Sequence, residues 1–265
     1  MAMDADTLAR AQLAAEQNHT LLELGPDDAP ADIDAAEAVQ DLYLRLWNQP
    51  AGAWKLGATV QRARIGLGLP RSFFGLVPRH RTLPSSARLE ASALRQRVFE
   101  LEIAFQLGAT LTPDGPEPTD ASVRAAVAGV CAAFELPQAR HRSLGEYGGA
   151  ALVADNGGGG YAVTGAVRPD WTAEGLAKAA EKITVAGETV SEGDSSSVID
   201  GPFACLVEFA RQARARGITL EAGQYVLTGC CVAAINPTGS PIVGEIEGVG
   251  KVSLELVGAG GRHAG

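Results

Sequence analysis

RVFELEIAFQLG, residues 97–108, carries the clearest strand pattern in the chain. Side chains two residues apart lie on the same face of a strand. The pattern therefore separates two faces, with Leu101, Ile103 and Phe105 on one and Glu100, Glu102 and Ala104 on the other. A strand with such an apolar back is expected to be central in a sheet and covered on both sides.

Two carboxylates on one covered face repel each other and resist the loss of their water. A divalent cation such as Mg²⁺ or Mn²⁺ relieves both problems, because hard oxygen ligands suit these ions. The alternative is an exposed strand face on which Glu100 and Glu102 are solvated. Glu135, in the apolar run AAFELPQ after a predicted helix, is an isolated acid that needs either a partner or solvent.

Around this strand the chain shows an α+β pattern, with a small helical region at residues 1–60 and a β-rich body at residues 61–265. Asp32 or Asp34 is expected to cap the second helix, whose apolar stripe includes Val39 and Tyr43. Pro202 suits the first turn of another helix and Gly217 its end. The helices are predicted over residues 7–17, 32–47, 120–133 and 202–217, and further strands over residues 224–229 and 251–258.

The chain has 265 residues and a net charge of −9, which makes it a poor candidate for binding nucleic acid. No apolar run approaches the roughly 20 residues that cross a bilayer, and the acidic start of the chain does not resemble an export signal. A cytoplasmic protein without a membrane partner is therefore expected. The cysteines, Cys131, Cys205, Cys230 and Cys231, have no zinc spacing and are expected to be reduced.

Residues 51–97 form a basic stretch, since they contain Lys55 and eight arginines but one acid, Glu90. Such a local field suits a small anionic ligand. The alternative is a solvated face on which each arginine pairs with a neighbouring acid. Lys55 lies in the apolar segment AWKLG, where partial burial would lower its pKa and allow acid–base chemistry, or where its stem would cover apolar surface.

Six segments between about Ala35 and the C-terminus resemble segments of one enzyme family and occur in the same order as in that family. It is the 2-keto-4-pentenoate hydratase / 4-oxalocrotonate decarboxylase family, a branch of the fumarylacetoacetate hydrolase superfamily. The segments are AAEAVQ at 35–40, AWKLG at 53–57, ELEIAF at 100–105, AFELP at 133–137, VADNGGGGYAVTG at 153–165, and LEAGQYVLTG at 220–229 with the later GKVSLEL. The resemblance implies a mixed, rolled β-sandwich with a small helical N-terminal part, usually assembled into homo-oligomers.

The resemblance also implies a site. Glu100, Glu102 and Glu135 would bind Mg²⁺ or Mn²⁺, which would chelate the 2-oxo-carboxylate end of a small anionic substrate. Lys55 would move protons or hold the carboxylate. Asp155 and Thr228 would be pocket residues.

The sequence departs from the family pattern at PRSFFG, where Phe73 stands in the place of an aspartate that precedes the FG pair. Arg71 beside it is also unusual for the family. Both residues are expected at the substrate site, and a second negative charge on the substrate, or a changed lid, would explain the arginine-rich stretch.

The reaction that follows from the resemblance is hydration of a 2-keto-4-pentenoate-type acid. The alternatives on the same fold are decarboxylation of a 2-oxo-diacid, carbon–carbon bond hydrolysis and tautomerisation. A different class of protein, a non-catalytic metal- or ligand-binding partner of a pathway enzyme, remains open because of the lost aspartate.

Overall fold

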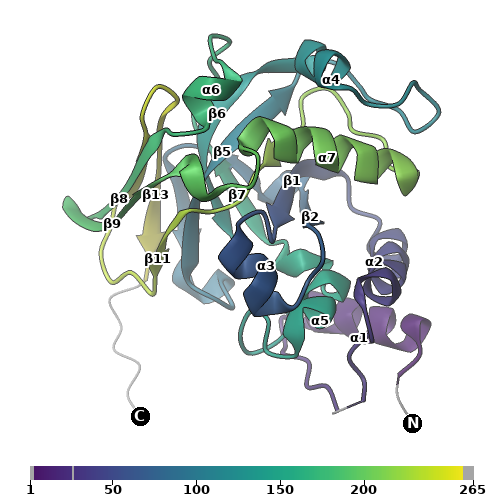
Figure 1. Cartoon of the computed structure of the whole chain (residues 1–265). Helices are drawn as coiled ribbons and strands as arrows, with labels where there is room; N and C mark the ends of the chain where they lie inside the picture. Colours follow the sequence, from purple (N-terminus) through teal and green to yellow (C-terminus); the bar gives the residue numbers. More distant parts are fainter. Residues whose placement is uncertain (1–2, 26, 259–265) are drawn as a thin grey trace.

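The computed structural model describes residues 3–25 and 27–258 and shows two curled β-sheets with helices packed around them (Figure 1). The eight-stranded sheet has the order β2-β1-β10-β5-β6-β7-β3, with β11 also paired to β5. The five-stranded sheet has the order β4-β13-β12-β8-β9. This arrangement confirms the predicted α+β, mixed and rolled β-sandwich.

The strands of the large sheet are β1 (Ala51–Gly57), β2 (Phe73–Pro78), β3 (Thr82–Pro84), β5 (Val98–Leu107), β6 (Val127–Leu136), β7 (Tyr161–Thr164), β10 (Tyr225–Leu227) and β11 (Val232–Ile235). Those of the small sheet are β4 (Ala87–Glu90), β8 (Ala180–Val185), β9 (Glu188–Asp194), β12 (Ile242–Ile246) and β13 (Gly250–Val257). The helices are α1 (Ala5–Asn18), α2 (Ile33–Trp47), α3 (Gln61–Leu67), α4 (Asp120–Ala126), α5 (Gly148–Ala154), α6 (Ala173–Leu176) and α7 (Pro202–Ala215).

The two faces of β5 meet different surroundings, as its alternation predicts. Phe105 contacts Phe203 of α7, and Leu101 lies against Gly244 of the small sheet, where an added Cβ would be 2.4 Å from its Cδ1. The opposite face of the large sheet is lined by small, fully buried side chains that include Ala53, Ala104, Cys131, Ala133 and Ala162. Small side chains leave room for the sheet to curl tightly on that side.

The helix predicted over residues 120–133 is wrong in its second half. A capping box at Thr119 starts α4 as expected, but the helix ends at Ala126 and the chain continues directly into β6. The run from Val130 to Leu136 is buried on both faces, because β6 lies between β5 and β7. A strand buried on both faces loses the alternation that distinguishes it from a buried helix.

The other predicted helices are confirmed. Asp32 caps α2 by accepting a hydrogen bond from the backbone N–H of Ala35, and α7 begins at Pro202. Gly217, just after α7, has φ +69°, a conformation that glycine adopts without strain. The four cysteines are free thiols, and no helix within residues 3–25 and 27–258 has the length and apolar composition to cross a bilayer.

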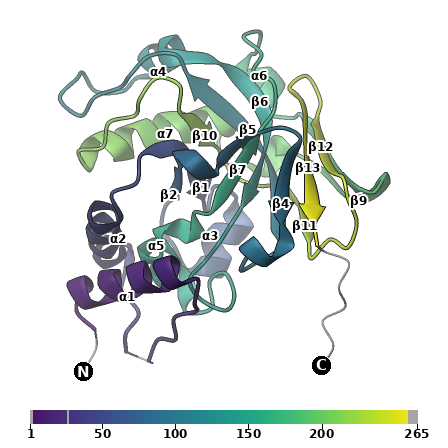
Figure 2. The ribbon, with the colours of Figure 1, turned by 180° about the vertical axis from the view of Figure 1, so that it is seen from behind.

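The N-terminal helices α1 and α2 pack together beside α5, at the end of the molecule opposite α4 (Figure 2). β1, which follows them, pairs with both β2 and β10 inside the large sheet. The expected boundary at residue 60, between a helical N-terminal region and a β-rich body, stays a proposal. The helices end at Trp47, ahead of the strand that carries Lys55.

Candidate metal centre

Three glutamates converge on the small-residue face of the large sheet. The antiparallel register of β5 and β6 places Glu100 directly opposite Glu135, and cross-strand partners project from the same face. Glu102 lies two residues along β5 and shares that face. One carboxylate oxygen from each residue lies within 4.8 Å of those of the other two.

Glu135 was expected after a helix, and the structure corrects this position. It lies within β6, which is why it faces a neighbouring strand. Its contact with Glu100 therefore depends on the pairing of two strands and not on the local sequence.

The cluster is buried and short of hydrogen-bond donors. Glu102 and Glu135 are 1% and 0% exposed. Both oxygens of Glu135 and Oε1 of Glu102 lack a hydrogen-bond partner, whereas Oε2 of Glu102 accepts a bond of 2.7 Å from the N–H of Gly229. Buried acceptors without partners are costly, so these atoms are in the state expected of ligands for a cation.

Burial sets the protonation of these acids. Burial, reinforced by the charge of Glu100, raises the pKa of Glu102 to about 8. Burial also raises the pKa of Glu135 well above its usual range, against the opposing effect of Lys55. Without a cation the cluster therefore binds protons at neutral pH, and a divalent ion would replace them.

Lys55 reaches the same cluster from β1. It pairs with Leu227 of β10, which in turn pairs with Ala104 of β5, so all three side chains share a face. Lys55 Nζ lies 3.4 Å from Glu135 Oε2 and 5.5 Å from the ring centroid of Phe73. Burial acts to lower the pKa of Lys55, but the charges of the three glutamates outweigh it, so the pKa is raised and not lowered.

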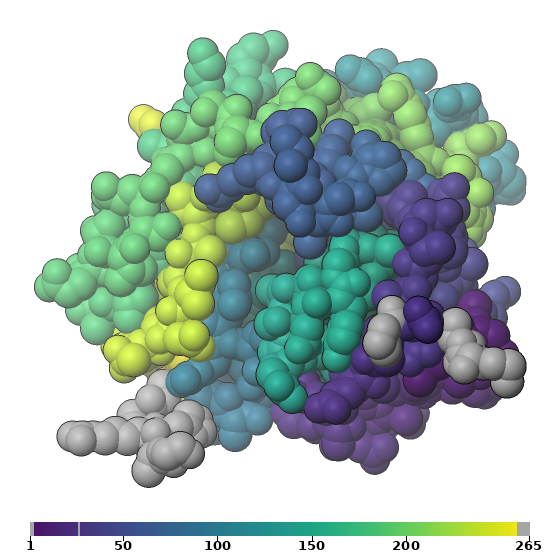
Figure 3. Space-filling model, turned by 60° about the horizontal axis from the view of Figure 1, so that its bottom comes forward, coloured from purple at the N-terminus to yellow at the C-terminus, as the bar shows by residue number. Residues whose placement is uncertain are grey.

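A cavity of about 310 Å³ opens onto this cluster. Figure 3 views the molecule from the side where the blue atoms of α3 and the teal atoms of α5 border a recessed area. The walls are mainly apolar, and the charged lining residues are Lys55, Glu100 and Arg62. Its volume lies at the lower end of the roughly 300–1,000 Å³ typical of small-molecule sites.

Phe73 lines this cavity, at the position where the family resemblance places an aspartate. Its ring fills the space beside Gly57 and Gly157, where an added Cβ would come within 2.1 Å and 2.8 Å of ring atoms. Among the described residues that line the cavity, Glu100 is the one acid. No other carboxylate there takes the place of the missing aspartate.

Asp155 and Thr228 are buried behind the cavity lining. The carboxylate of Asp155 accepts a hydrogen bond from the backbone N–H of Arg140, and its Oδ1 lies 3.3 Å from the Arg140 guanidinium. Asp155 thereby holds the 3₁₀ turn Asn156–Gly158, whose Gly157 lines the cavity. Thr228 Oγ1 donates to the carbonyl of Ile103 and positions the backbone just before Gly229.

Arg71 is directed away from the cavity lining. Its guanidinium pairs with Asp34 at 2.8 Å and Glu37 at 2.5 Å, both on α2. Four other arginines of the basic stretch also have acidic partners: Arg79, Arg81, Arg88 and Arg95. Most arginines of the basic stretch therefore have acidic partners, as the alternative interpretation expects, although the pairs of Arg81 and Arg95 with Glu16 are largely buried and not on a solvated face.

The sequence did not point to Gly229 or Cys230 as residues of the site. It also did not show that Arg62, among the arginines of the basic stretch, lines the cavity. Gly229 has φ +105° and would place a Cβ 1.8 Å from Thr59 Oγ1. A glycine at the end of the strand predicted over residues 224–229, in the segment VLTG, was the available signal for it.

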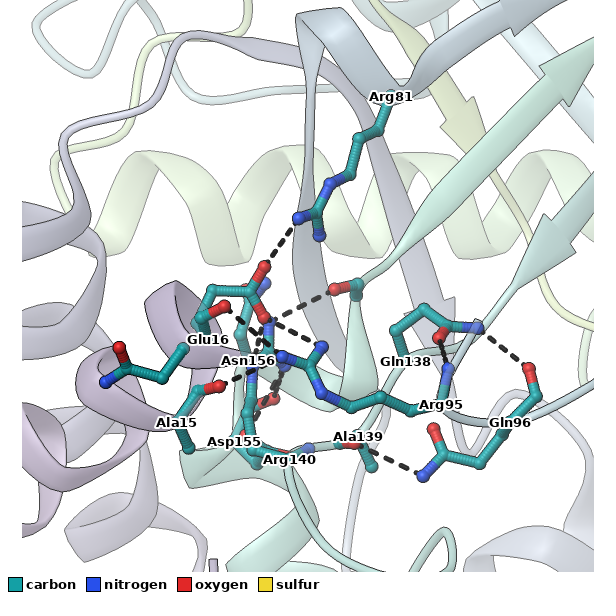
Figure 4. Close-up of polar contacts among 12 residues, drawn as sticks. Ala15, Glu16, Arg81, Arg95, Gln96, Gln138, Ala139, Arg140, Asp155 and Asn156 are labelled. Atoms are coloured by element: carbon teal, nitrogen blue, oxygen red, sulfur yellow. Dashed lines mark hydrogen bonds and ion pairs between the residues drawn. The ribbon is translucent and has the colours of Figure 1, made fainter. Parts of the chain in front are cut away.

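A buried ionic cluster supports the site from behind (Figure 4). Glu16 of α1 pairs with Arg81, Arg95 and Arg140, at distances of 2.7, 3.1 and 3.2 Å. Arg140 also holds Asp155, so α1 is connected to the turn that lines the cavity. The three guanidinium groups outweigh the burial of Glu16 and lower its pKa to about 2.

A curled mixed sheet that carries buried carboxylates beside a lysine defines a class of enzymes, those of the fumarylacetoacetate hydrolase type. The chain belongs to this family: the family model described as fumarylacetoacetate (FAA) hydrolase C-terminal matches residues 70–257.

Several relatives match most of the chain, and two of them serve as examples. A 4-oxalocrotonate decarboxylase of a Pseudomonas species is 25% identical over 240 residues, which cover 89% of this chain and 91% of the relative. A 2-keto-4-pentenoate hydratase of Paraburkholderia xenovorans is 28% identical over 231 residues, which cover 85% and 84%.

Solved structures share the fold. The 4-oxalocrotonate decarboxylase of Pseudomonas putida, complexed with magnesium and adipate, has a TM-score of 0.83 at 23% identity and covers 96% of this chain and 97% of its own. The fumarylpyruvate hydrolase of Pseudomonas aeruginosa, complexed with Mn²⁺ and pyruvate, has a TM-score of 0.60 at 18% identity, with coverages of 77% and 88%.

Proposed function

We propose that this chain is a divalent-metal-dependent lyase that acts on a small 2-oxo or 2-hydroxydienoic acid. The observation that carries the proposal is the convergence of Glu100, Glu102 and Glu135 beside Lys55 at the base of a cavity. The names of the relatives support the substrate class, and the magnesium and manganese in the solved structures support the metal.

The donor set fits Mg²⁺ or Mn²⁺, because it consists of carboxylate oxygens, three of which are buried without a hydrogen-bond partner. When bound, such an ion supplies Lewis-acid chemistry, since it polarises the carbonyl of a 2-oxo acid. Gly229 orients Glu102 by donating its N–H to one oxygen. Lys55 Nζ lies among the carboxylates and is placed to hold a substrate carboxylate or to transfer a proton.

Hydration of a 2-hydroxydienoate, which the sequence resemblance places first, and decarboxylation of a 2-oxo-diacid, which it places second, are the two leading candidate reactions. Phe73 favours the second, because the described lining residues offer no acid besides Glu100 to activate a water molecule. Carbon–carbon bond hydrolysis and tautomerisation are the third and fourth candidate reactions. All four would begin with polarisation of the carbonyl of a 2-oxo acid.

The test is turnover of 2-hydroxypenta-2,4-dienoate and of a 2-oxo-hexenedioate with and without Mg²⁺, while water addition and CO₂ release are measured separately. Glu102→Ala is expected to lose metal binding and at least about 100-fold in turnover. Glu181→Gln is the matched control, since Glu181 is a buried glutamate on β8 outside the cluster.

Activity in the absence of a divalent ion, or full activity in Glu102→Ala, would contradict the proposal. Binding of Mg²⁺ and oxalate without turnover of either acid would favour a non-catalytic, metal-binding partner subunit.

A homo-oligomer is also proposed. Val190 of β9 and Ile235 of β11 are 51% and 70% exposed and line one groove, an arrangement that suits burial against a second copy. Light scattering should give a mass above that of one 27.3 kDa chain, and Ile235→Asp should lower it. A single-chain mass for the unaltered protein would exclude the oligomer. A cytoplasmic location and a pathway partner enzyme stay predictions.

A further inference from the structure

Arg62 is the arginine of the basic stretch that lines the cavity. It lies near the start of α3, and its side chain is exposed to solvent. Within residues 3–25 and 27–258 it has no acidic partner at ion-pair distance, unlike Arg71, Arg81 or Arg95. Within the described residues, no carboxylate therefore compensates the positive charge of Arg62.

The cavity has one cationic side chain at its base and another at its rim. Lys55 is buried beside the carboxylate cluster, whereas Arg62 is exposed on α3. The walls between them are apolar and include Val60, Leu67 and Leu144. Glu100 is the one acid among the described lining residues, and it belongs to the metal-binding cluster.

This distribution of charge matches an elongated molecule with an anionic group at each end. A 2-oxo-carboxylate would occupy the cluster and Lys55, and an apolar chain would lie along the walls. A mono-acid of the same length would leave Arg62 with no anion to bind.

We propose that Arg62 binds a second carboxylate, remote from the 2-oxo-acid group, and so makes the cavity selective for 2-oxo-dicarboxylic acids. This inference rests on the proposed function, because it takes the cluster as the site of the 2-oxo-acid end. A guanidinium suits the role, since it donates two parallel hydrogen bonds to a carboxylate. Selectivity for dicarboxylates would favour decarboxylation over hydration of a mono-acid.

The experiment compares two ligands of equal chain length, 2-oxoadipate and 2-oxohexanoate, by calorimetry on the full chain with Mn²⁺ and again with EDTA. The proteins are the unaltered chain, Arg62→Gln, Arg62→Lys and Arg97→Gln. Arg97 is the control, because within the described residues it also lacks an acidic partner but does not line the cavity. No residue of α3 is buried, so substitution of Arg62 is not expected to affect folding.

The unaltered chain should bind 2-oxoadipate about 10- to 100-fold more tightly than 2-oxohexanoate. Arg62→Gln should remove this preference by weakening only the diacid, Arg62→Lys should retain part of it, and Arg97→Gln should leave it unchanged.

Metal-dependent binding of both acids with equal affinity, or an equal loss for both acids in Arg62→Gln, would overturn the role of Arg62 and leave the proposed function standing. Failure of both acids to bind in the presence of Mn²⁺, or binding that is unaffected by EDTA, would overturn the proposed function and this inference with it.

Discussion

Single residues define the chemistry of this site, and Lys55 shows how its neighbours change a side chain. Its burial in an apolar segment predicts a lowered pKa, but the surrounding carboxylates reverse the direction. A lysine held in its charged form is suited to neutralising a substrate carboxylate or to donating a proton. Phe73 replaces an expected acid with an aromatic surface that packs against glycines and under the lysine.

Lys55→Met should separate metal binding from catalysis. Removal of the ammonium leaves the three carboxylates in place, so Mg²⁺ should bind at least as tightly as before. Turnover should fall about 100-fold or more, because the group that holds or transfers the proton is lost. Calorimetry with Mg²⁺ and steady-state kinetics measure the two effects, with Lys251→Met at the exposed end of β13 as the control. Near-normal turnover in Lys55→Met would show that the lysine has no catalytic role.

Strands and turns, rather than single residues, bring the site together. The turn Asn156–Gly158 docks on β2 through paired hydrogen bonds, since Asn156 Oδ1 accepts from Leu76 N–H and Asn156 Nδ2 donates to Leu76 O. The Asn156 carbonyl lies against Gly75, where an added Cβ would be 2.1 Å away. A glycine on β2 is thus required for the turn to lie beside the Lys55 strand.

Gly75→Ala should displace this turn. The clash is with backbone, which cannot rotate away, so we expect a loss of roughly 2 kcal/mol or more in stability together with weaker substrate binding. Gly66→Ala is the matched control, because an added Cβ at Gly66, inside α3, meets nothing within 4 Å. That change should be neutral or stabilise by about 0.5–1 kcal/mol. Chemical denaturation of both variants measures the difference, and equal stabilities would contradict the close packing of the turn.

At the scale of the whole molecule, buried ion pairs and hydrogen bonds hold the N-terminal helices against the β-rich body. Glu16 of α1 forms ion pairs with three arginines from different segments, and Gln40 of α2 donates a hydrogen bond of 2.6 Å to the Phe74 carbonyl. The N-terminal helices therefore support the segments that line the cavity, in addition to packing against the β-rich body.

Glu16→Gln should destabilise the protein by about 3 kcal/mol at neutral pH, because three guanidinium groups lose the buried counter-charge that they share, and Arg140 keeps Asp155 as its remaining partner. The pKa of Glu16 is lowered to about 2, so its stabilising effect is complete above the ordinary glutamate pKa and is lost as pH falls through 2. Glu23→Gln, which breaks an exposed pair with Arg142, should cost less than about 1 kcal/mol. Urea denaturation at pH 7 distinguishes the variants, and equal losses would argue against a structural role for the cluster.

Stability should also depend on pH and metal together. The pKa of Glu102 is raised to about 8 by burial and by Glu100, and that of Glu181 is raised to about 8 by burial. Native protein therefore holds protons that the unfolded chain releases near pH 4.5, so without metal its stability falls as pH rises from 4.5 through 8.

Mg²⁺ should counter this fall, with a gain in melting temperature of about 5 °C at pH 8.5 and a smaller gain at pH 6. Thermal scans with EDTA and with Mg²⁺ at both values of pH measure it. Glu102→Gln should lose the Mg²⁺-dependent gain, and an equal gain at both pH values would contradict proton displacement by the ion.

The sequence alone determined features that depend on neighbouring residues. The alternation of residues 97–108 predicted the face shared by Glu100 and Glu102. Asp32 or Asp34 marked the start of one helix and Pro202 the start of another. These features rest on the geometry of a strand or a helical turn, which extends over a few residues.

Only the tertiary structure decided which distant residues meet. Glu135 faces Glu100 because β5 and β6 pair in one particular register, and Lys55 joins them through β10. The tertiary structure also decided the roles of individual arginines, since Arg71 forms an ion pair with Glu37 of α2, whereas Arg62 lines the cavity. Strand register and ion pairing depend on packing between segments far apart in the chain, and no local periodicity encodes them.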